Sequence, residues 1–354
     1  MKESKKSQKG RGALINPANR FLATEYAIEH PEAIDDWERE STGTQFYEEH
    51  GKTIVNKVKS PDIPIAWSLN PYQGCEHGCV YCYARNSHEY WGFSAGVDFE
   101  SRIVVKRQAP QLLRELLSSR KWKGEAISLS GNTDCYQPIE RKLKITRQLL
   151  EVCLQYRNAV GIITKNALVL RDLDLLTELN RHQLVMVYVS ITSTNELLRR
   201  KLEPRTSTYE ERFRILETLA KAGIPCGVMN APVIPGLNDA DMYDVLRKAS
   251  LAGAKQAGYT MVRLNGAVSD LFRSWLKEYF PDRMDKVLNL ISGAHGGQLN
   301  DHRFGVRMKG EGTLAELIEQ QFRLYCRQFH LNEEKFSPDT SLYRREVQGQ
   351  LSLF

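Results

Sequence analysis

The chain has 354 residues, of which 42% are hydrophobic and 26% are charged, a composition typical of a globular protein with one large domain and extensions. No apolar run reaches about 18 residues, and the N-terminus lacks the apolar region of a signal peptide. We therefore expect no membrane span and a cytoplasmic location. The net charge of +6 permits an anionic partner such as nucleic acid but does not require one.

Residues 1–60 are expected to form an N-terminal extension with few structural signals. Residues 1–12 carry five basic side chains and one acidic side chain, namely Lys2, Lys5, Lys6, Lys9, Arg11 and Glu3. A charge run of this kind predicts a solvated, disordered tail, and a weak contact with nucleic acid is the functional alternative.

Residues 61–266 alternate short apolar runs with amphipathic stretches, which predicts repeated strand–helix units. The predicted strands are 65–70, 126–130, 159–164, 184–191, 226–231 and 258–264. The predicted helices are 110–120, 141–156, 168–180, 209–222 and 239–252. Six such units indicate an α/β fold built as a partial (β/α)6 TIM-like barrel, with its chemistry at the carboxyl ends of the strands.

Residues 267–345 are predicted to be a mostly helical C-terminal extension, with helices at 271–279, 283–290 and 313–329. Residues 346–354 are polar before their last few positions and are expected to be a flexible tail.

Polar residues recur where the predicted strands end. They are Thr133 and Asp134 after the second strand, Lys165 after the third, Ser190 in the fourth, Asn230 in the fifth, and Arg263 and Asn265 at the sixth. Their recurrence at one end of successive apolar strands is a stronger signal of a site than any one of them.

Three of the seven cysteines, Cys75, Cys79 and Cys82, follow the first predicted strand with the spacing C-x3-C-x2-C. Three thiolates on one loop can hold three irons of a [4Fe–4S] cluster and leave the fourth iron open to a small chelating ligand. Zinc is the alternative, and its fourth ligand would have to be His77 or His88. Of the others, Cys153 and Cys326 lie in helical patterns and should be replaceable, whereas Cys226 is expected in the core.

The pattern C-x3-C-x-aromatic-C, with Tyr81 as the aromatic residue, resembles the signature of the radical S-adenosylmethionine (SAM) superfamily. Tyr83, together with Thr133-Asp134, Thr164-Lys165 and Val189-Ser190, resembles the spore photoproduct lyase-like subgroup. The resemblance implies a [4Fe–4S] cluster on the three cysteines and SAM chelated to the fourth iron. One electron, from a flavodoxin- or ferredoxin-like donor, would cleave SAM to methionine and a 5′-deoxyadenosyl radical, which abstracts hydrogen from the substrate.

The resemblance also implies roles for single residues. Tyr81 would pack near the adenine, and Thr133 and Asp134 would face SAM. Lys165 and Ser190 match positions that contact the SAM carboxylate or ribose, and Asn230 would border the adenosyl group. For each of them the alternative is a residue that caps a strand end or forms a turn.

The sequence departs from the lyases at one position. The lyases have a hydrogen-donating cysteine directly before the Thr-Asp pair, where this chain has Asn132, and Cys135 follows the pair instead. Tyr83, which matches the relay tyrosine of the lyases, is retained. Tyr83 and Cys135 are therefore the catalytic candidates, with a small apolar residue under the loop as the alternative for Cys135.

The last five residues, Gln350, Leu351, Ser352, Leu353 and Phe354, resemble the peptide by which bacterial repair and replication proteins bind the DNA sliding clamp. Three hypotheses remain open: a radical SAM enzyme acting on nucleic acid, such as a damaged or modified base in a repair-like reaction; one acting on a protein or small molecule; and a non-catalytic iron–sulfur or zinc protein that binds nucleic acid.

Overall fold

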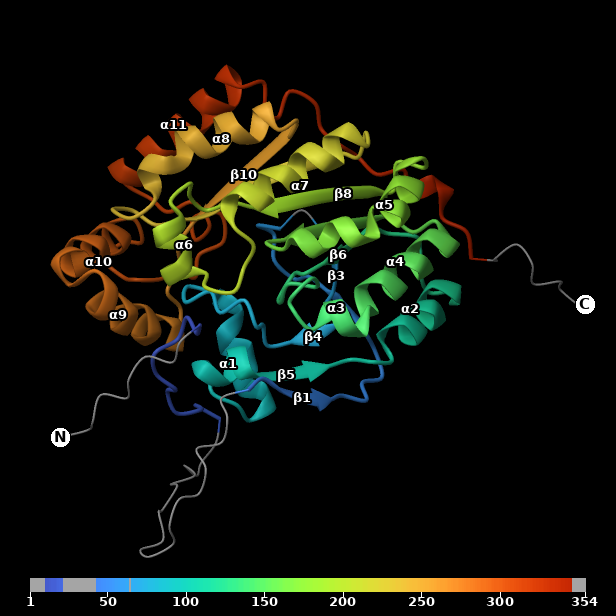
Figure 1. Cartoon of the computed structure of the whole chain (residues 1–354), viewed down its shortest axis with the longest axis horizontal. Coiled ribbons are helices and arrows are strands. Elements are labelled where there is room, and N and C mark those ends of the chain that lie inside the picture. Colours follow the sequence, from blue (N-terminus) through green and yellow to red (C-terminus); the bar gives the residue numbers. More distant parts are fainter. Residues whose placement is uncertain (1–9, 22–42, 64, 346–354) are drawn as a thin grey trace, which may run out of the picture.

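The computed structural model describes residues 10–21, 43–63 and 65–345 (Figure 1). Its main sheet has the strand order β10-β9-β8-β7-β6-β3-β2. The six parallel strands are β3 (Trp67–Leu69), β6 (Ile127–Leu129), β7 (Val160–Thr164), β8 (Val185–Ser190), β9 (Cys226–Val233) and β10 (Gln256–Met261). They confirm the six predicted strands and the partial barrel. The short strand β2 (Val55–Lys57) pairs antiparallel with β3 and forms the edge of the sheet.

Helices cover the outside of this sheet (Figure 1). They are α2 (Ala109–Ser118), α4 (Ile145–Tyr156), α5 (Leu173–Asn180), α7 (Tyr209–Lys221) and α8 (Met242–Leu251). Short helical turns precede three of them: α3 (Glu140–Leu143), η2 (Ala167–Asp172) and η3 (Asp239–Asp241). The helix predicted over 141–156 is divided into α3 and α4 because Lys144 has a left-handed backbone with φ of 53°.

Helix α7 illustrates why these segments fold as they do. Thr208 and Glu211 form a capping box that satisfies backbone N–H groups at its start. Ile215, Leu216 and Leu219 share one face and are fully buried against the sheet. Helix α6 (Glu196–Leu202) lies between β8 and α7 in the chain, and the sequence analysis does not predict it.

A second, three-stranded sheet has the order β1-β5-β4, with β1 (Gln45–Glu48), β4 (Tyr72–Gln73) and β5 (Arg102–Val105). The 3-10 helix η1 (Tyr83–Trp91) and helix α1 (Val97–Ser101) connect the cysteine segment to β5. None of these elements is predicted from the sequence.

Residues 10–21 run across the cysteine segment, and we call them the N-terminal strap. The backbone N–H groups of Gly12 and Ala13 donate to the Glu100 carboxylate at 2.9 and 2.7 Å, and the Arg11 guanidinium donates to the Glu100 carbonyl. The prediction of a disordered tail over 1–12 is therefore wrong for residues 10–12, which are ordered by a buried carboxylate. Residues 1–9 lie outside the described part of the chain.

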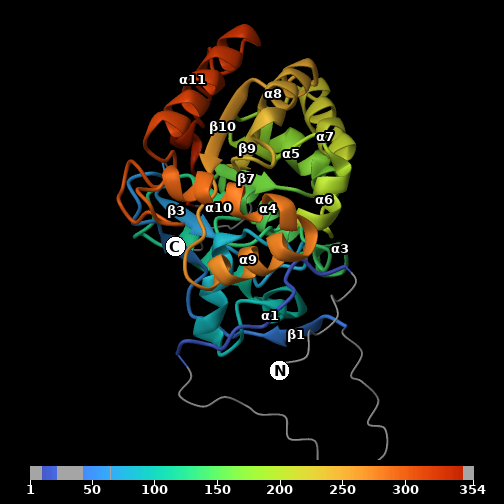
Figure 2. The ribbon, with the colours of Figure 1, turned by 90° about the vertical axis from the view of Figure 1, so that its left-hand side faces the viewer.

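The C-terminal extension contains the three predicted helices, observed as α9 (Ala267–Tyr279), α10 (Met284–Gly293) and α11 (Thr313–Gln328), with the short turns η4 (Pro281–Arg283) and η5 (Thr340–Leu342). Helix α11 lies alongside α8 (Figure 1 and Figure 2). In the described residues, no helix is long and apolar enough to cross a membrane.

Residues 299–308, between α10 and α11, form what we call the closing segment, because they bridge the gap that six strands leave in a barrel. Met261 and Leu264 donate backbone bonds to Met308 and Leu299 at 2.9 and 3.0 Å, so this segment runs beside β10. Asp62, which precedes β3 at the other end of the parallel array, accepts from the Gly305 N–H at 2.7 Å and pairs with Arg307.

Candidate active site

The segment that carries Cys75, Cys79 and Cys82 turns sharply at Gly74 and Gly78, where φ is 80° and 71°. These backbone conformations favour glycine. The three cysteines are free thiols, and Cys75 and Cys79 are each only 8% exposed. The segment therefore presents three thiols at the carboxyl end of β3, as the sequence predicts.

Gln137, a fully buried residue, fixes the start of this segment from both sides. Its side-chain N–H donates to the Gly74 carbonyl at 3.1 Å, and its side-chain oxygen accepts from the Glu76 N–H at 2.9 Å. The Glu76 carboxylate in turn accepts from the Ile139 N–H at 2.8 Å. The cysteine segment is thereby attached to the loop after β6.

Arg85 and Glu100 fix the middle of the segment. They form an ion pair whose two side chains are fully buried, and the Arg85 Nε–H donates to the Cys79 carbonyl at 2.9 Å. Because Glu100 also binds the N-terminal strap, one buried carboxylate connects the strap, Arg85 and the Cys79 backbone.

The donor chemistry of the segment fits an iron–sulfur cluster. Burial, with a further effect of Glu203, raises the pKa of the Cys79 thiol to about 12, and Cys82 also raises it. Burial raises the pKa of Cys75 well above its ordinary value, and Asp134 and Cys79 act in the same direction. Cys82 packs against the apolar clusters that contain Cys75 and Cys79, so the three thiols belong to one site. Bound iron favours deprotonated thiols.

In the described residues, no group of three His, Cys, Asp or Glu side chains surrounds a single metal ion. A cubane cluster uses one iron per thiolate, and its ligands need not converge on one point. His77 does not supply a fourth zinc ligand, because both nitrogens of its ring are engaged within the protein. His77 Nδ1 lies 3.4 Å from Asp134, and Nε2 lies 3.1 Å from the Asn166 amide. Burial lowers the pKa of His77 to about 4, so the ring is neutral. His88, the other candidate, packs between the Phe93 and Phe99 rings.

Asp134 and Thr133 hold the strand ends in position. The Asp134 carboxylate accepts from the Thr164 hydroxyl at 2.8 Å and from the Lys165 backbone N–H at 2.8 Å, which connects the ends of β6 and β7. The Thr133 hydroxyl donates to the Tyr72 carbonyl at 2.8 Å. These contacts agree with the alternative in which both residues cap strand ends.

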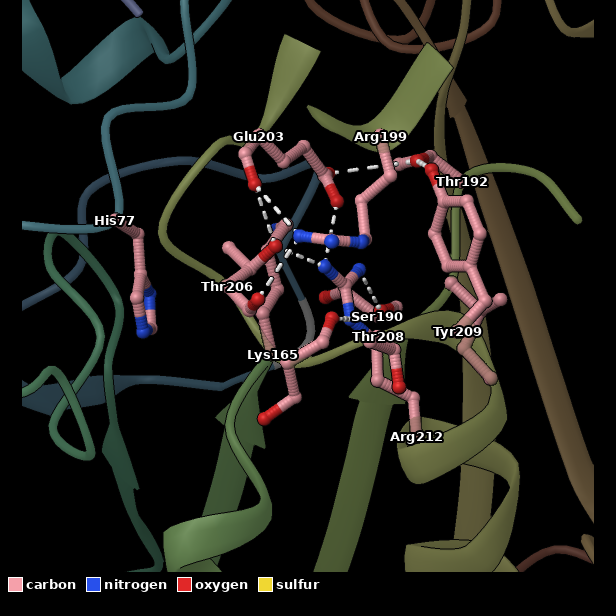
Figure 3. Close-up of polar contacts among 12 residues, drawn as sticks. His77, Lys165, Ser190, Thr192, Arg199, Glu203, Thr206, Thr208, Tyr209 and Arg212 are labelled. Carbon is pink, nitrogen blue, oxygen red and sulfur yellow. Dashed lines mark hydrogen bonds and ion pairs between the residues drawn. The ribbon is translucent and has the colours of Figure 1, made fainter. Parts of the chain in front are cut away.

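The fully buried Glu203 and Arg212 and the partly buried Lys165 form a group of charges beside the cysteine segment (Figure 3). Arg212 and Glu203 make an ion pair of 2.7 Å, and both side chains are fully buried. Burial acts to lower the pKa of Lys165, but Cys79 and Glu203 outweigh it and the pKa is raised, so the side chain is an ammonium. Within the described part of the chain, this ammonium has no hydrogen-bond or ion-pair partner.

Ser190 is the last residue of β8, and Asn230 lies within the neighbouring strand β9. Arg212 Nη1–H donates to the Ser190 carbonyl at 2.9 Å, which anchors the end of β8 and leaves the Ser190 hydroxyl without a partner in the described residues. The Asn230 amide donates to the Ile191 carbonyl at 3.0 Å, while its side-chain oxygen is buried and unbonded. An unsatisfied buried acceptor is costly unless a ligand donates to it.

Tyr81, Tyr83 and Cys135 lie in three different environments. The buried Tyr81 hydroxyl donates to Glu203, so its phenol end is engaged within the protein. Tyr83 is 52% exposed, and its hydroxyl donates to the Gly131 carbonyl at the end of β6. Cys135 has no exposed surface and belongs to the hydrophobic core, which agrees with the alternative of a small apolar residue under the loop. Cys226 lies in the same core, as expected.

The sequence analysis missed the residues that hold the site together: Gln137, Arg85, Glu100, Glu203 and Arg212. One signal was available for Arg212. It lies on the apolar face of α7 with Ile215, Leu216 and Leu219, and a charge on a buried face predicts a buried partner. Nothing in the local sequence identifies Glu203 as that partner.

Three thiols at the mouth of an open α/β barrel, beside an unpaired ammonium, define a barrel enzyme with a metal cofactor. The family model for the radical SAM superfamily matches residues 69–249, half of the chain. The chain belongs to the radical SAM superfamily, and its cofactors are a [4Fe–4S] cluster and SAM.

The chain is similar to uncharacterized proteins of distant organisms. It is 32% identical over 251 residues to one from Mycobacterium tuberculosis, covering 70% of this chain and 74% of that protein. It is 29% identical over 238 residues to one from Methanocaldococcus jannaschii, covering 67% and 85%.

Among solved structures, this chain is similar to the one described as spore photoproduct lyase complexed with dinucleoside spore photoproduct. The TM-score is 0.58 at 16% sequence identity, covering 80% of this chain and 79% of the lyase. A mutant of the lyase with bound AdoMet gives the same TM-score at 15% identity, covering 80% and 78%. These similarities show a shared fold.

Proposed function

We propose that this radical SAM enzyme holds its cluster on Cys75, Cys79 and Cys82 and acts on nucleic acid in a repair-like reaction. The observation that carries the cluster assignment is the location of three neighbouring free thiols on one glycine-bounded segment at the barrel mouth. The four other cysteines are buried and scattered along the chain, so they offer no second set of ligands.

Cys75, Cys79 and Cys82 would hold the cluster, which when bound would supply the electron for reductive cleavage of SAM and so the radical chemistry for hydrogen abstraction from the substrate. The protein positions SAM and excludes water. The unpaired Lys165 ammonium suits the carboxylate of SAM, and the Ser190 hydroxyl suits a carboxylate or ribose oxygen. The unbonded oxygen of Asn230 can accept an N–H or O–H of the adenosyl group. Tyr83, exposed at the mouth, is the remaining candidate for a hydrogen relay to the substrate.

Nucleic acid is the proposed substrate because three features agree. The fold is shared with a lyase whose structure contains a dinucleoside lesion, the net charge is +6, and the chain ends in a clamp-binding-like peptide. Asn132 occupies the position of the hydrogen-donating cysteine of the lyases, and its amide is bound to Gln73 and Ser87. We therefore propose a reaction other than spore photoproduct reversal.

The test is anaerobic. The purified chain is reconstituted with iron and sulfide, reduced with dithionite, given SAM and assayed for 5′-deoxyadenosine. We expect the product from the wild type and none from Cys82→Ala, which should also lack a complete cluster. A complete cluster in Cys82→Ala, Cys75→Ala or Cys79→Ala would refute the ligand assignment. Adding damaged DNA should then raise the yield, and a protein substrate that raises it instead would refute the nucleic-acid proposal.

The proposed contact with the sliding clamp depends on Gln350, Leu351, Ser352, Leu353 and Phe354, which lie outside the described residues. A peptide with this sequence offers Leu353 and Phe354 as apolar anchors and Gln350 as a hydrogen-bonding group. Deleting the five residues should abolish binding to a purified clamp and leave SAM cleavage unchanged. Equal clamp affinity of the deleted and full-length chains would refute this partner.

A further inference from the structure

Arg263 and Asn265 follow β10 at the barrel mouth, and the functions assigned above do not use them. The backbone N–H groups of Val262 and Leu264 donate to Val233 and Leu299 at 2.9 and 3.0 Å. The side chains of Val262 and Leu264 are 1% and 2% exposed and pack in the core with α9 and α10. Because side chains alternate along an extended segment, Arg263 and Asn265 lie on the opposite side, away from this core.

Arg263 is a half-buried cation without a counterion. Within residues 10–21, 43–63 and 65–345, its guanidinium has no hydrogen-bond or ion-pair partner. Burial and the neighbouring Arg307 lower its pKa. The nearest carboxylate that acts on it, Asp62, is already paired with Arg307 and bonded to the Gly305 N–H. The guanidinium is thus left to bind an anion from outside.

Asn265 gives a second, independent indication of a ligand. Its side-chain oxygen is buried and has no hydrogen-bond partner in the described residues. Its backbone carbonyl, in contrast, accepts from the Asn86 amide at 2.8 Å, which fixes the residue against η1. A fixed residue with an unsatisfied buried acceptor indicates a place where a ligand donates a hydrogen bond.

The two residues face the reactive part of the barrel mouth. Arg263 lies close enough to Tyr83 to lower the pKa of its phenol, although burial of the phenol raises that pKa overall. The Tyr83 hydroxyl donates to the Gly131 carbonyl, just after β6. The closing segment and Asp62 bound the opposite side. A ligand on Arg263 would therefore lie between the closing segment and the exposed Tyr83 ring.

We propose that Arg263 and Asn265 form a substrate subsite that recognises one nucleotide. The guanidinium binds a phosphodiester oxygen, and the Asn265 side-chain oxygen accepts an N–H or O–H group of the same nucleotide. This subsite rests on the proposed nucleic-acid substrate and gives that substrate a defined place beside Tyr83. A planar guanidinium with several donors is the preferred protein group for phosphate.

The experiment measures the anaerobic binding of a fluorescein-labelled single-stranded oligonucleotide to the reconstituted holoenzyme with SAM, by fluorescence anisotropy. Arg263→Gln should weaken binding about tenfold or more, as loss of a charge-assisted hydrogen bond predicts. Arg263→Lys should be intermediate because it keeps the charge but loses the planar donors. Asn265→Ala should weaken binding less. The matched control is Arg247→Gln on α8, an exposed arginine already paired with Asp244 and distant in the fold from the end of β10, which should change binding less than about twofold.

Two outcomes overturn the subsite. One is unchanged oligonucleotide binding by Arg263→Gln. The other is that Arg263→Gln no longer shows the change that SAM induces in the EPR spectrum of the wild-type cluster, because Arg263 would then bind the cofactor and not the substrate. If the wild type itself binds no oligonucleotide, the nucleic-acid proposal fails, and calorimetry with inorganic pyrophosphate tests the anion site separately. Pyrophosphate binding that is lost in Arg263→Gln supports the site, and equal binding by both proteins refutes it.

Discussion

Glu203 is the acid on which several site residues converge. It pairs with Arg212, accepts from the Tyr81 hydroxyl and raises the pKa of Lys165. Arg212 in turn holds the Ser190 carbonyl at the end of β8. One buried carboxylate therefore sets the positions of side chains from the cysteine segment, β7, β8 and α7.

Replacing Glu203 with glutamine should destabilise the protein by about 3 kcal/mol, because it leaves Arg212 buried without a counterion. Burial raises the pKa of Glu203, but Arg212 and Lys165 outweigh it and hold the pKa below 4.5. The stabilisation from the ionised form is present above pH 4.5 and is lost as the pH falls through the folded-state pKa. Thermal unfolding between pH 7 and pH 4 should thus show a difference between wild type and Glu203→Gln that shrinks below pH 4.5.

The control for this prediction is Glu217→Gln, which removes an exposed ion pair between Glu217 and Lys221 on α7, the helix that also carries Arg212. Exposed pairs of this kind contribute little, so its unfolding should match the wild type at every pH. A Glu203→Gln protein as stable as the wild type at pH 7 would contradict the central role given to the carboxylate.

Among the elements, the barrel strands follow from the sequence because most of them are short, largely apolar runs. Strands β6 and β8 are buried at nearly every position, as expected for strands covered on both faces, whereas β10 is only partly buried. Strand β1 could not be found in this way, since all four of its residues are exposed. The positions of Lys165 directly after β7, of Ser190 at the end of β8 and of Asn230 within β9 follow from the strands themselves. The pair of Glu203 and Arg212 does not, because it depends on how the loop before α7 folds over β8.

The N-terminal strap is the element with the tightest contact to the cysteine segment. A Cβ atom on Gly12 would lie 1.6 Å from the Gly78 carbonyl oxygen, so Gly12→Ala must displace the strap or the segment. We expect a loss of about 1–3 kcal/mol of stability from overpacking. The iron–sulfur absorption of the reconstituted holoenzyme should also fade faster in air.

Gly293→Ala is the matched control, since a Cβ at that helical position meets no atom within 4 Å. This variant should leave unchanged both the stability of the protein and the rate at which the iron–sulfur absorption fades in air. Equal fading rates for Gly12→Ala and the wild type would show that the strap does not protect the cluster.

At the scale of the whole molecule, Asp62 joins the two edges of the open barrel. Asp62→Ala removes the acceptor for the Gly305 N–H and the partner of Arg307. Hydrogen exchange measured by mass spectrometry should become several-fold faster in the closing segment and stay unchanged in β8. The control is Asp244→Ala, which breaks an exposed pair with Arg247 on α8. Faster exchange throughout the barrel would contradict a local closing role.

The closing contact has a consequence for the order of folding during synthesis. Asp62 and Gly305 are 243 positions apart, so the barrel cannot close until most of the chain has left the ribosome. Contacts from Glu100, Gln137 and Arg85, all within the first 137 residues, shape the start and middle of the cysteine segment. Val80, His77 and Tyr81 of the segment also bind residues 202–205, so its final shape requires the chain as far as the residues just after α6. The thiols can therefore be arranged while the side of the barrel is still open, and the residues beside Arg263 are completed last.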